Sequence, residues 1–273
     1  MGTSSTTNHA DLTAWGETGT VEVSDPAALG AARQIAQRHL DALGRVCQRD
    51  SPRAEVHQIP CAAGSSVDVS PLLARVVQAS LETAARTDGL VDPTVRVPRR
   101  SGGSHGAVPQ QSWFPVCGKA TGQSRGGGWR RVRLDGARLT VPPGSTLELR
   151  TSALAIGLDD IALVATQLTG ADVLVGLGGR AATLGQGHAV TDPRHVVDPR
   201  TGRPAPSTWS LVEVSASTCR TASAQAVAAA VLGDDALDWL DRHHANARLT
   251  RPDGSVVRVG AFQPVALRTL VAA

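Results

Sequence analysis

The sequence lacks tyrosine altogether and has two phenylalanines and one methionine among its 273 residues. No tyrosine hydroxyl is therefore present to act as a catalytic acid or base, and the core has to be built mainly from alanine, valine and leucine. Hydrophobic residues make up 41% of the chain and charged residues 19%, which favours a globular protein over a disordered one. The length allows one large domain or two modest ones.

Cysteine pairs are also missing. The four cysteines contain no Cys-x-x-Cys motif, which removes support for a zinc site or a thioredoxin-like redox site; they are Cys47, Cys61, Cys117 and Cys219. Cys219 is expected to be an inert buried thiol. The net charge of +3 comes from arginines spread along the chain, so no nucleic-acid-binding patch is expected.

Long apolar runs are absent as well. The N-terminal segment "MGTSSTTNHADLTAWGE" has no apolar h-region, and no later stretch of about 18 apolar residues is evident. We therefore expect a soluble, cytoplasmic protein without a membrane span.

Local signals in the rest of the chain predict an α+β fold with antiparallel sheets packed against helices. Helices are expected where capping residues precede apolar periodicity, as at Asp25-Pro26 and Ser70-Pro71. The expected helices cover residues 24–43, 70–89, 157–170, 221–233 and 234–244. The expected strands cover 18–23, 173–179 and 209–217, with hairpins over 129–141 and 247–260. Strands in hairpins and helices in separate blocks favour this class over a doubly wound parallel sheet.

The domain organisation follows from composition. Residues 1–13 are polar and are expected to form a flexible N-terminus. A single domain is expected over 14–273, with a flexible insert near 99–128 that is rich in Gly, Ser, Gln and Pro.

The segment "HVVDPRTGRPA" brings four reactive side chains together in one bend: those of His195, Asp198, Arg200 and Thr201. His195 could act as a general base near neutral pH, and Asp198 could orient it or bind a cation. The planar guanidinium of Arg200 suits a phosphate. The alternative is a simple turn in which the aspartate caps the backbone and the arginine faces water, and the residues alone do not decide between the two.

Two further segments are open to a functional and a structural interpretation. "GLGGRAATLG" (176–185) follows a strand, and its bare backbone N–H groups could hold a phosphate; the alternative is a tight strand-to-strand turn. Asp159 and Asp160 could bind a metal, but their expected place at the start of a helix, where acidic residues are favourable, offers a simpler explanation.

In order along the chain, five segments together resemble the FAD:protein FMN transferases, the ApbE-like family. They are "AWGETGTVEV", "SPLLARVVQASLETAARTDGLVDPTV", "VLVGLGG", "HVVDPRTGRPAP" and "VEVSASTCRTASAQAVAAAVLG". The resemblance extends from about residue 14 to 264 and implies an ApbE-like architecture related to the T-fold.

The resemblance implies that FAD is cleaved at its pyrophosphate and that FMN passes to a Thr or Ser hydroxyl of an acceptor flavoprotein, with release of AMP and assistance from Mg²⁺. It implies catalytic roles for His195, the base for the acceptor hydroxyl, and for Asp198. It implies metal contacts from the Ala153 carbonyl and the Ser223 hydroxyl. The residues expected to bind the flavin nucleotide are Trp15, Gly16, Asp92, Gly178, Gly179, Arg200, Thr201 and Gly202.

The chain departs from the family pattern at positions that matter for the metal. Ser223 and Val227 stand where the family has an aspartate and a threonine that bind the ion, and Ile156 stands where it has a lysine. Arg150 and Arg180 replace aspartates. A hard cation without its carboxylate loses its main electrostatic anchor. Two hypotheses therefore remain at this point: an FMN transferase, or a catalytically impaired FAD-binding module of the same fold.

Overall fold

The computed structural model of the chain describes residues 8–49, 51–59, 64–95, 127–143 and 145–263. Its largest sheet is antiparallel throughout, with strand order β1-β2-β6-β7-β8-β11-β12-β13. These strands are β1 (His9–Ala14), β2 (Glu17–Val23), β6 (Val173–Leu177), β7 (Arg180–Thr183), β8 (Gln186–Thr191), β11 (Leu211–Ala216), β12 (Asn246–Thr250) and β13 (Val256–Val259). The expected α+β class with antiparallel sheets is confirmed.

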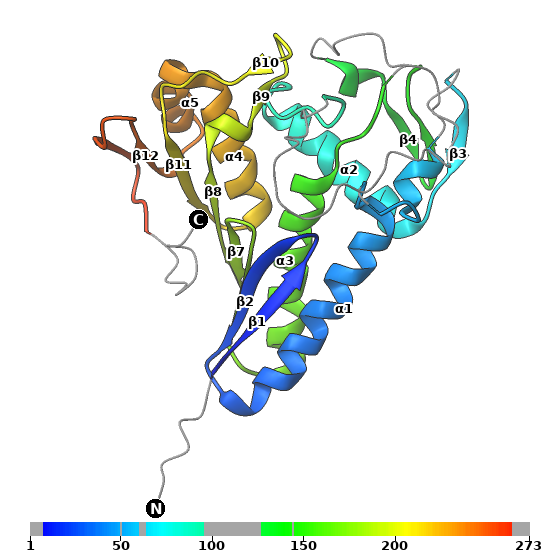
Figure 1. Cartoon of the computed structure of the whole chain (residues 1–273), viewed down its shortest axis with the longest axis vertical. Helices are drawn as coiled ribbons and strands as arrows, with labels where there is room; N and C mark the ends of the chain where they lie inside the picture. Colours follow the sequence, from blue (N-terminus) through cyan, green and yellow to red (C-terminus); the bar gives the residue numbers. More distant parts are fainter. Residues whose placement is uncertain (1–7, 50, 60–63, 96–126, 144, 264–273) are drawn as a thin grey trace, which may run out of the picture.

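Helices pack against one face of this sheet. They are α1 (Leu29–Cys47), α3 (Arg150–Thr169), α4 (Cys219–Leu232) and the short α5 (Ala236–Arg242), whereas α2 (Pro71–Arg86) packs on α1 and α3. Figure 1 shows α1 and α3 running side by side along the sheet, with α4 beside α3 and α2 at the upper end of the helical layer. A small sheet of β3 (Ser66–Asp68), β5 (Arg138–Thr140) and β4 (Arg133–Asp135) lies beyond α2.

The helix starts follow the predicted capping chemistry. The Asp25 carboxylate accepts a hydrogen bond from the Ala27 N–H at 2.9 Å, at the start of a short 3-10 turn (Pro26–Ala28) that leads into α1. The Ser70 hydroxyl likewise accepts from the Leu73 N–H at 3.2 Å, and Thr218 caps α4 in the same way. A side-chain oxygen in each case satisfies an N–H that has no partner inside the helix.

Small side chains allow α4 to lie close to the sheet. The buried face of α4 consists largely of alanines, and a Cβ atom on Gly187 of β8 would overlap the backbone of Cys219 at the start of that helix. The expectation of a core built from Ala, Val and Leu is confirmed among the buried residues.

The structure corrects three expectations about local structure. Residues 9–13, expected to be flexible, form most of β1, because Leu12 is buried and the whole strand pairs with β2; residues 1–7 lie outside the described part of the chain. Helix α3 starts at Arg150 rather than at 157, so Asp159 and Asp160 lie in the middle of a helix. In the 129–141 hairpin, a 3-10 turn occupies Gly128–Arg131 and the strands start only at Arg133. Of the insert expected near 99–128, residues 99–126 also lie outside the described chain.

Helix α3 is long and apolar enough to cross a membrane by length and composition alone, although no such stretch was expected from the sequence. It packs against β6 and β7 on one side and against α1, α2 and α4 on others, and half of its apolar window is buried inside the protein. This is the environment of a core helix.

Candidate functional site

A cavity of about 110 Å³ lies where the interior of α2 and the loop that follows it, the first turn of α3, the middle of α4 and the segment after β8 meet. Its polar side chains include Asp92, Glu148 and His195, and Val227 of α4 contributes an apolar wall. The structure therefore brings together Asp92 and His195, which are about 100 positions apart in the sequence. Val227, expected next to the metal, lies at the same cavity.

His195 ends a short 3-10 helix (Pro193–His195) that follows β8. Asp192 caps this helix, accepting from the Arg194 N–H at 2.9 Å, and its carboxylate lies 3.6 Å from the Nδ1 atom of His195. The side chain of His195 is 58% exposed, so the imidazole can be reached from solvent as well as from the cavity. The hydrogen bonds from Arg194 hold the pKa of the Asp192 carboxyl below its usual value, which keeps Asp192 ionised at neutral pH.

Asp198 has a different partner from the expected one. Its carboxylate accepts from the N–H of Arg200 at 2.8 Å and from the Nε and Nη2 atoms at 3.0 Å each. The expected role of Asp198 in orienting His195 is thus corrected: the carboxylate nearest the imidazole belongs to Asp192. Asp198 is buried because it holds the bend from the inside, and its carboxylate raises the pKa of Arg200.

The rest of the bend is built as a turn. Gly202 has φ of 70°, and its N–H donates to the Asp198 carbonyl at 2.8 Å. Thr201 accepts from the Arg203 N–H at 3.2 Å, and the flanking strands β9 (Val197–Asp198) and β10 (Arg203–Pro204) pair with each other. The alternative in which the aspartate caps the backbone describes these contacts. Arg200 remains 52% exposed and reaches the Val231 carbonyl at the end of α4.

Asp92 is buried beside the cavity and is well supplied with donors. One carboxylate oxygen accepts from the N–H and the hydroxyl of Thr94, at 2.8 and 2.6 Å, and the other accepts from the Gly127 N–H at 3.0 Å. Asp92 thereby fixes the loop after α2 against residue 127. Its role in nucleotide binding stays a prediction.

The predicted glycine turn belongs to a second cluster of residues, located where β2 begins and β6 ends. Gly178 and Gly179 have φ of 56° and 71° and join β6 to β7, as the strand-to-strand alternative requires. Next to them, Arg150 donates to the Glu17 carboxylate at 2.7 Å and to the Trp15 carbonyl at 3.0 Å.

Trp15 and Gly16 form the turn between β1 and β2, both with positive φ. The Trp15 indole donates to the Leu40 carbonyl of α1 at 3.2 Å, so this tryptophan packs on α1 and does not line the His195 cavity. The first turn of α3 connects the two clusters, because Arg150 contacts the glycine-turn cluster while Thr151 and Ser152 line the cavity.

The residues expected to hold Mg²⁺ do not fit that ion. Ser223 is buried, its hydroxyl lies 3.9 Å from the Cys219 sulfur, and Val227 offers no oxygen. Ala153 is fully buried in the interior of α3. Within the described ranges, no group of three or more His, Cys, Asp or Glu side chains is placed to hold a metal. Mg²⁺ prefers near-octahedral oxygen coordination with carboxylates, which this set does not provide.

Burial raises the pKa of the Cys219 thiol to about 12. The thiol therefore stays protonated at neutral pH, as expected for an inert cysteine.

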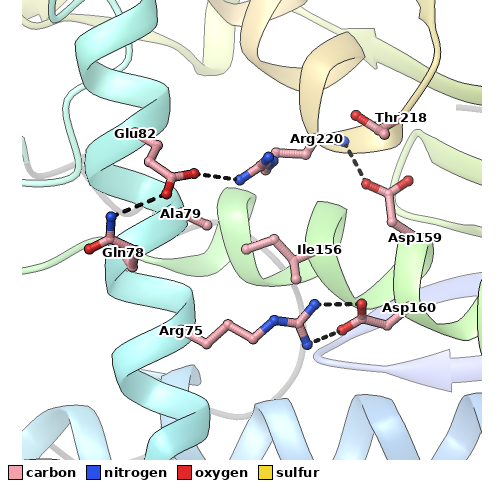
Figure 2. Close-up of a pocket in the computed structure, with 9 residues that line it drawn as sticks. All are labelled: Arg75, Gln78, Ala79, Glu82, Ile156, Asp159, Asp160, Thr218 and Arg220. Atoms are coloured by element: carbon pink, nitrogen blue, oxygen red, sulfur yellow. Dashed lines mark hydrogen bonds and ion pairs between the residues drawn. The ribbon is translucent and has the colours of Figure 1, made fainter. Parts of the chain in front are cut away.

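A larger cavity, of about 330 Å³, opens between α2, α3 and the start of α4 (Figure 2). Its charges are paired with each other: Arg75 binds Asp160 through two contacts of 2.6 Å, and Arg220 lies 3.0 Å from Glu82. Asp159 accepts from the backbone N–H of Arg220. None of the residues expected in catalysis or nucleotide binding lines this cavity, although Asp159 and Asp160, considered above as metal ligands, do. The pairing of its charges leaves little charge to bind a phosphate.

A known protein family matches most of the chain. Residues 1–194 match the model of the ApbE family. The chain belongs to the ApbE family. The matched range ends one residue before His195, so the segment 195–205 lies outside it. No curated protein shows significant similarity to the chain.

Solved ApbE structures resemble this chain over nearly the whole length of both proteins. The ApbE protein from Thermotoga maritima has a TM-score of 0.73 and 18% identity, over 92% of this chain and 96% of its own. The Pseudomonas stutzeri flavinyl transferase ApbE in its apo form has a TM-score of 0.74 and 17% identity, over 92% and 94%. The flavin transferase ApbE from Vibrio cholerae has a TM-score of 0.73 and 16% identity, over 93% and 96%. At these identities the likeness establishes the fold.

Two features of the candidate site were not predicted. Asp192 was overlooked, although the Asp-Pro pair at 192–193 is the same helix-start signal that predicted the helix beginning at Asp25-Pro26. The Arg150–Glu17 ion pair could not be found in the same way, because its partners are 133 positions apart and no local pattern connects them.

Proposed function

We propose that this chain is an FAD:protein FMN transferase that moves FMN from FAD to a Thr or Ser hydroxyl of an acceptor flavoprotein. The acceptor oxygen forms a new bond to the phosphorus of the FMN half, the bond from that phosphorus to the bridging oxygen of the pyrophosphate breaks, and AMP leaves. The hydroxyl proton passes to a base. Membership of the ApbE family and the flavin transferase names of its structural relatives support this choice of reaction.

The observation that carries the proposal is the position of His195. Its imidazole stands at the rim of the cavity, more than half exposed, where a side chain of another protein can reach it. Asp192, ionised and 3.6 Å from Nδ1, favours the tautomer that carries its proton on Nδ1 and leaves Nε2 free to accept one. FAD bound between the cavity and the Gly178–Gly179 turn would contact both clusters, because α3 joins them.

The ion is not part of this proposal, because the expected metal positions do not fit Mg²⁺. Positioning and fixed charges of the chain itself are left to supply the stabilisation that phosphoryl transfer requires.

A second candidate function is an FAD-binding module without turnover. Ser223 and Val227 favour it, because neither supplies the carboxylate that anchors a catalytic cation. The two candidates differ in whether the His195 imidazole takes part in chemistry.

The deciding experiment incubates the purified chain with FAD and a flavoprotein acceptor that carries a Thr or Ser at its flavinylation position, with and without Mg²⁺. Covalent flavin on the acceptor is detected by in-gel fluorescence. The transferase proposal expects fluorescence with wild type and a loss of roughly a hundredfold to ten-thousandfold in rate for His195→Ala, at unchanged FAD affinity. FAD binding without fluorescent acceptor in any condition would establish the binding module instead.

A further inference from the structure

Arg180 is the first residue of β7, directly after the Gly178–Gly179 turn. It lies opposite Ala189 of β8, which belongs to the core beneath α4, so the Arg180 side chain is on the face of the sheet that the helices cover. Helices α3 and α4 both pack against β7, and the charged groups Glu17 and Arg150 lie near the guanidinium. The arginine therefore reaches in between the start of α4 and the first turn of α3.

Among the described residues, Arg180 forms no ion pair of its own. Its Nη1 donates to the Gly178 carbonyl at 2.9 Å, its Nε is buried without a hydrogen-bond partner, and no carboxylate pairs with it within the described residues. The nearby Glu17 carboxylate is engaged by Arg150 at 2.7 Å. A guanidinium taken from water without an anion costs free energy, and burial lowers the pKa of Arg180 accordingly. An anion from outside the protein would remove this cost.

The same region contains the expected metal position. Ser223 lies one helical turn after Cys219, with their Oγ and Sγ atoms 3.9 Å apart. The Cys219 Sγ atom lies 3.7 Å from the carbonyl of His188, which pairs with Ala181, the residue after Arg180. A fixed positive charge here repels a divalent cation and attracts the phosphate oxygens that such a cation would otherwise bind. A guanidinium also matches two phosphate oxygens at once through its planar fork of N–H donors.

We propose that Arg180 takes the place of a divalent cation in this chain and binds the pyrophosphate of FAD beside the Gly178–Gly179 turn. The inference rests on the proposed function for the identity of the ligand. Its own content is separate: the site binds a pyrophosphate without metal, and it does so through Arg180.

The test measures FAD affinity by fluorescence quenching in EDTA and in Mg²⁺, for wild type, Arg180→Met and Arg180→Lys. Arg251→Met is the matched control, because Arg251 also has a buried Nε without a partner but lies in the β12–β13 turn, stacked on Trp209. Inorganic pyrophosphate, with melting temperature as the readout, serves as a second probe that does not depend on flavin. Near-UV circular dichroism confirms that each variant is folded.

Wild type should bind FAD equally well in EDTA and in Mg²⁺. Arg180→Met should bind about tenfold to a hundredfold more weakly, Arg180→Lys should recover part of the loss, and Arg251→Met should match wild type. If FAD binding by wild type depends on Mg²⁺, the inference is overturned, even if Arg180→Met does not fold. If a folded Arg180→Met binds FAD with unchanged affinity, the inference is also overturned. If FAD fails to bind but pyrophosphate raises the melting temperature of wild type and not of Arg180→Met, the proposed function is wrong and the anion site stands. If pyrophosphate stabilises neither protein, or both equally, the anion site is wrong.

Discussion

The Asp198 carboxylate accepts hydrogen bonds from the backbone N–H, Nε and Nη2 of Arg200, at 2.8, 3.0 and 3.0 Å. Asp198 is buried and Arg200 is half exposed, so the pair closes the bend that follows His195. It does not contact the imidazole itself. The carboxylate closest to the imidazole is that of Asp192. The two aspartates therefore have separable roles, one in the shape of the loop and one next to the imidazole of His195.

Asp198→Asn should lower the free energy of unfolding by about 1–3 kcal/mol, because a buried acceptor of charged donors loses its charge. Asp192→Asn should lower the transfer rate, by less than the roughly hundredfold or more expected for loss of the His195 imidazole, because a carboxylate beside Nδ1 no longer favours the tautomer with Nε2 free. Denaturant titration and transfer kinetics measure the two effects. A transfer rate that falls with a folded Asp198→Asn and not with Asp192→Asn would reverse the assignment.

The side-chain caps that were predicted from the sequence, at Asp25 and Ser70, are present in the structure, and a third cap, at Thr218, precedes the helix predicted over 221–233. The helix predicted over 234–244 is present as α5 without such a cap. Asp25, Ser70 and Thr218 each bind an N–H of the first turn, and such a signal is contained within four residues. Helix α3 has no side-chain cap at Leu149 and no acidic residue in its first turn, which is why its start was placed seven residues too late. The misplaced start produced the wrong explanation of Asp159 and Asp160.

The parts of the candidate site that are contained in short segments could be predicted from the sequence. The bend at 195–205 and the glycine turn are visible in the sequence because each is a short run of turn-forming residues. The distances between them depend on how α2, α3 and α4 pack on the sheet, and no residue pattern contains that information. The pairing of Asp198 with Arg200 in place of His195 is a further example, since all three residues lie within one short segment and only the backbone path decides which partners meet.

Asp159 and Asp160 are neighbours on α3 with unequal roles. Asp159 accepts from the N–H groups of Cys219 and Arg220, at 2.7 and 3.1 Å, and so caps α4 from another helix. Asp160 forms an ion pair with Arg75, which is more than half exposed. Asp159→Ala should therefore cost about 1–3 kcal/mol of unfolding free energy, and Asp160→Ala less than about 1 kcal/mol.

Burial raises the pKa of the Asp159 carboxyl, so its ionised form is disfavoured in the folded protein relative to the unfolded one. Asp159→Asn keeps an acceptor oxygen for α4 and removes the buried charge, and it should cost less than Asp159→Ala. Urea titrations at neutral pH compare the three variants. Equal losses for Asp159→Ala and Asp160→Ala would contradict the capping role.

Restoring oxygen ligands on α4 should strengthen the affinity of the chain for Mg²⁺. Ser223→Asp combined with Val227→Thr places a carboxylate and a hydroxyl one turn apart on α4, next to the cavity that Val227 lines. Calorimetry with Mg²⁺ in the presence of FAD should detect binding by the double variant and none by wild type, because Mg²⁺ is anchored by carboxylates. Ser223→Ala with Val227→Thr is the control without the charge. The same affinity in the control and in the carboxylate variant would place the ion elsewhere.

His188 should make the fold sensitive to acid. The residue is 2% exposed, its Nδ1 has no hydrogen-bond partner, and burial lowers its pKa to about 4. In the unfolded chain the imidazole titrates near its ordinary pKa of about 6.5, so between pH 6.5 and 4 the unfolded state binds more protons than the folded state. The contribution of the neutral His188 to the free energy of unfolding is therefore fully present above pH 6.5 and is lost as the pH falls toward 4. The free energy of unfolding should fall by about 2 kcal/mol between pH 7 and 4.5 for this reason.

Denaturant titrations at pH 7 and 4.5 test this on wild type, His188→Gln and the exposed-residue control His9→Gln. His188→Gln should be less stable than wild type at pH 7, because glutamine packs less well beside Phe262, whose ring centroid lies 5.9 Å from that of His188. It should nevertheless lose about 2 kcal/mol less on acidification, because it has no group at this position to protonate on unfolding. His9→Gln should follow wild type at both pH values. If wild type and His188→Gln lose the same free energy, the imidazole is already protonated in the folded protein at pH 4.5, and the acid sensitivity arises from other groups.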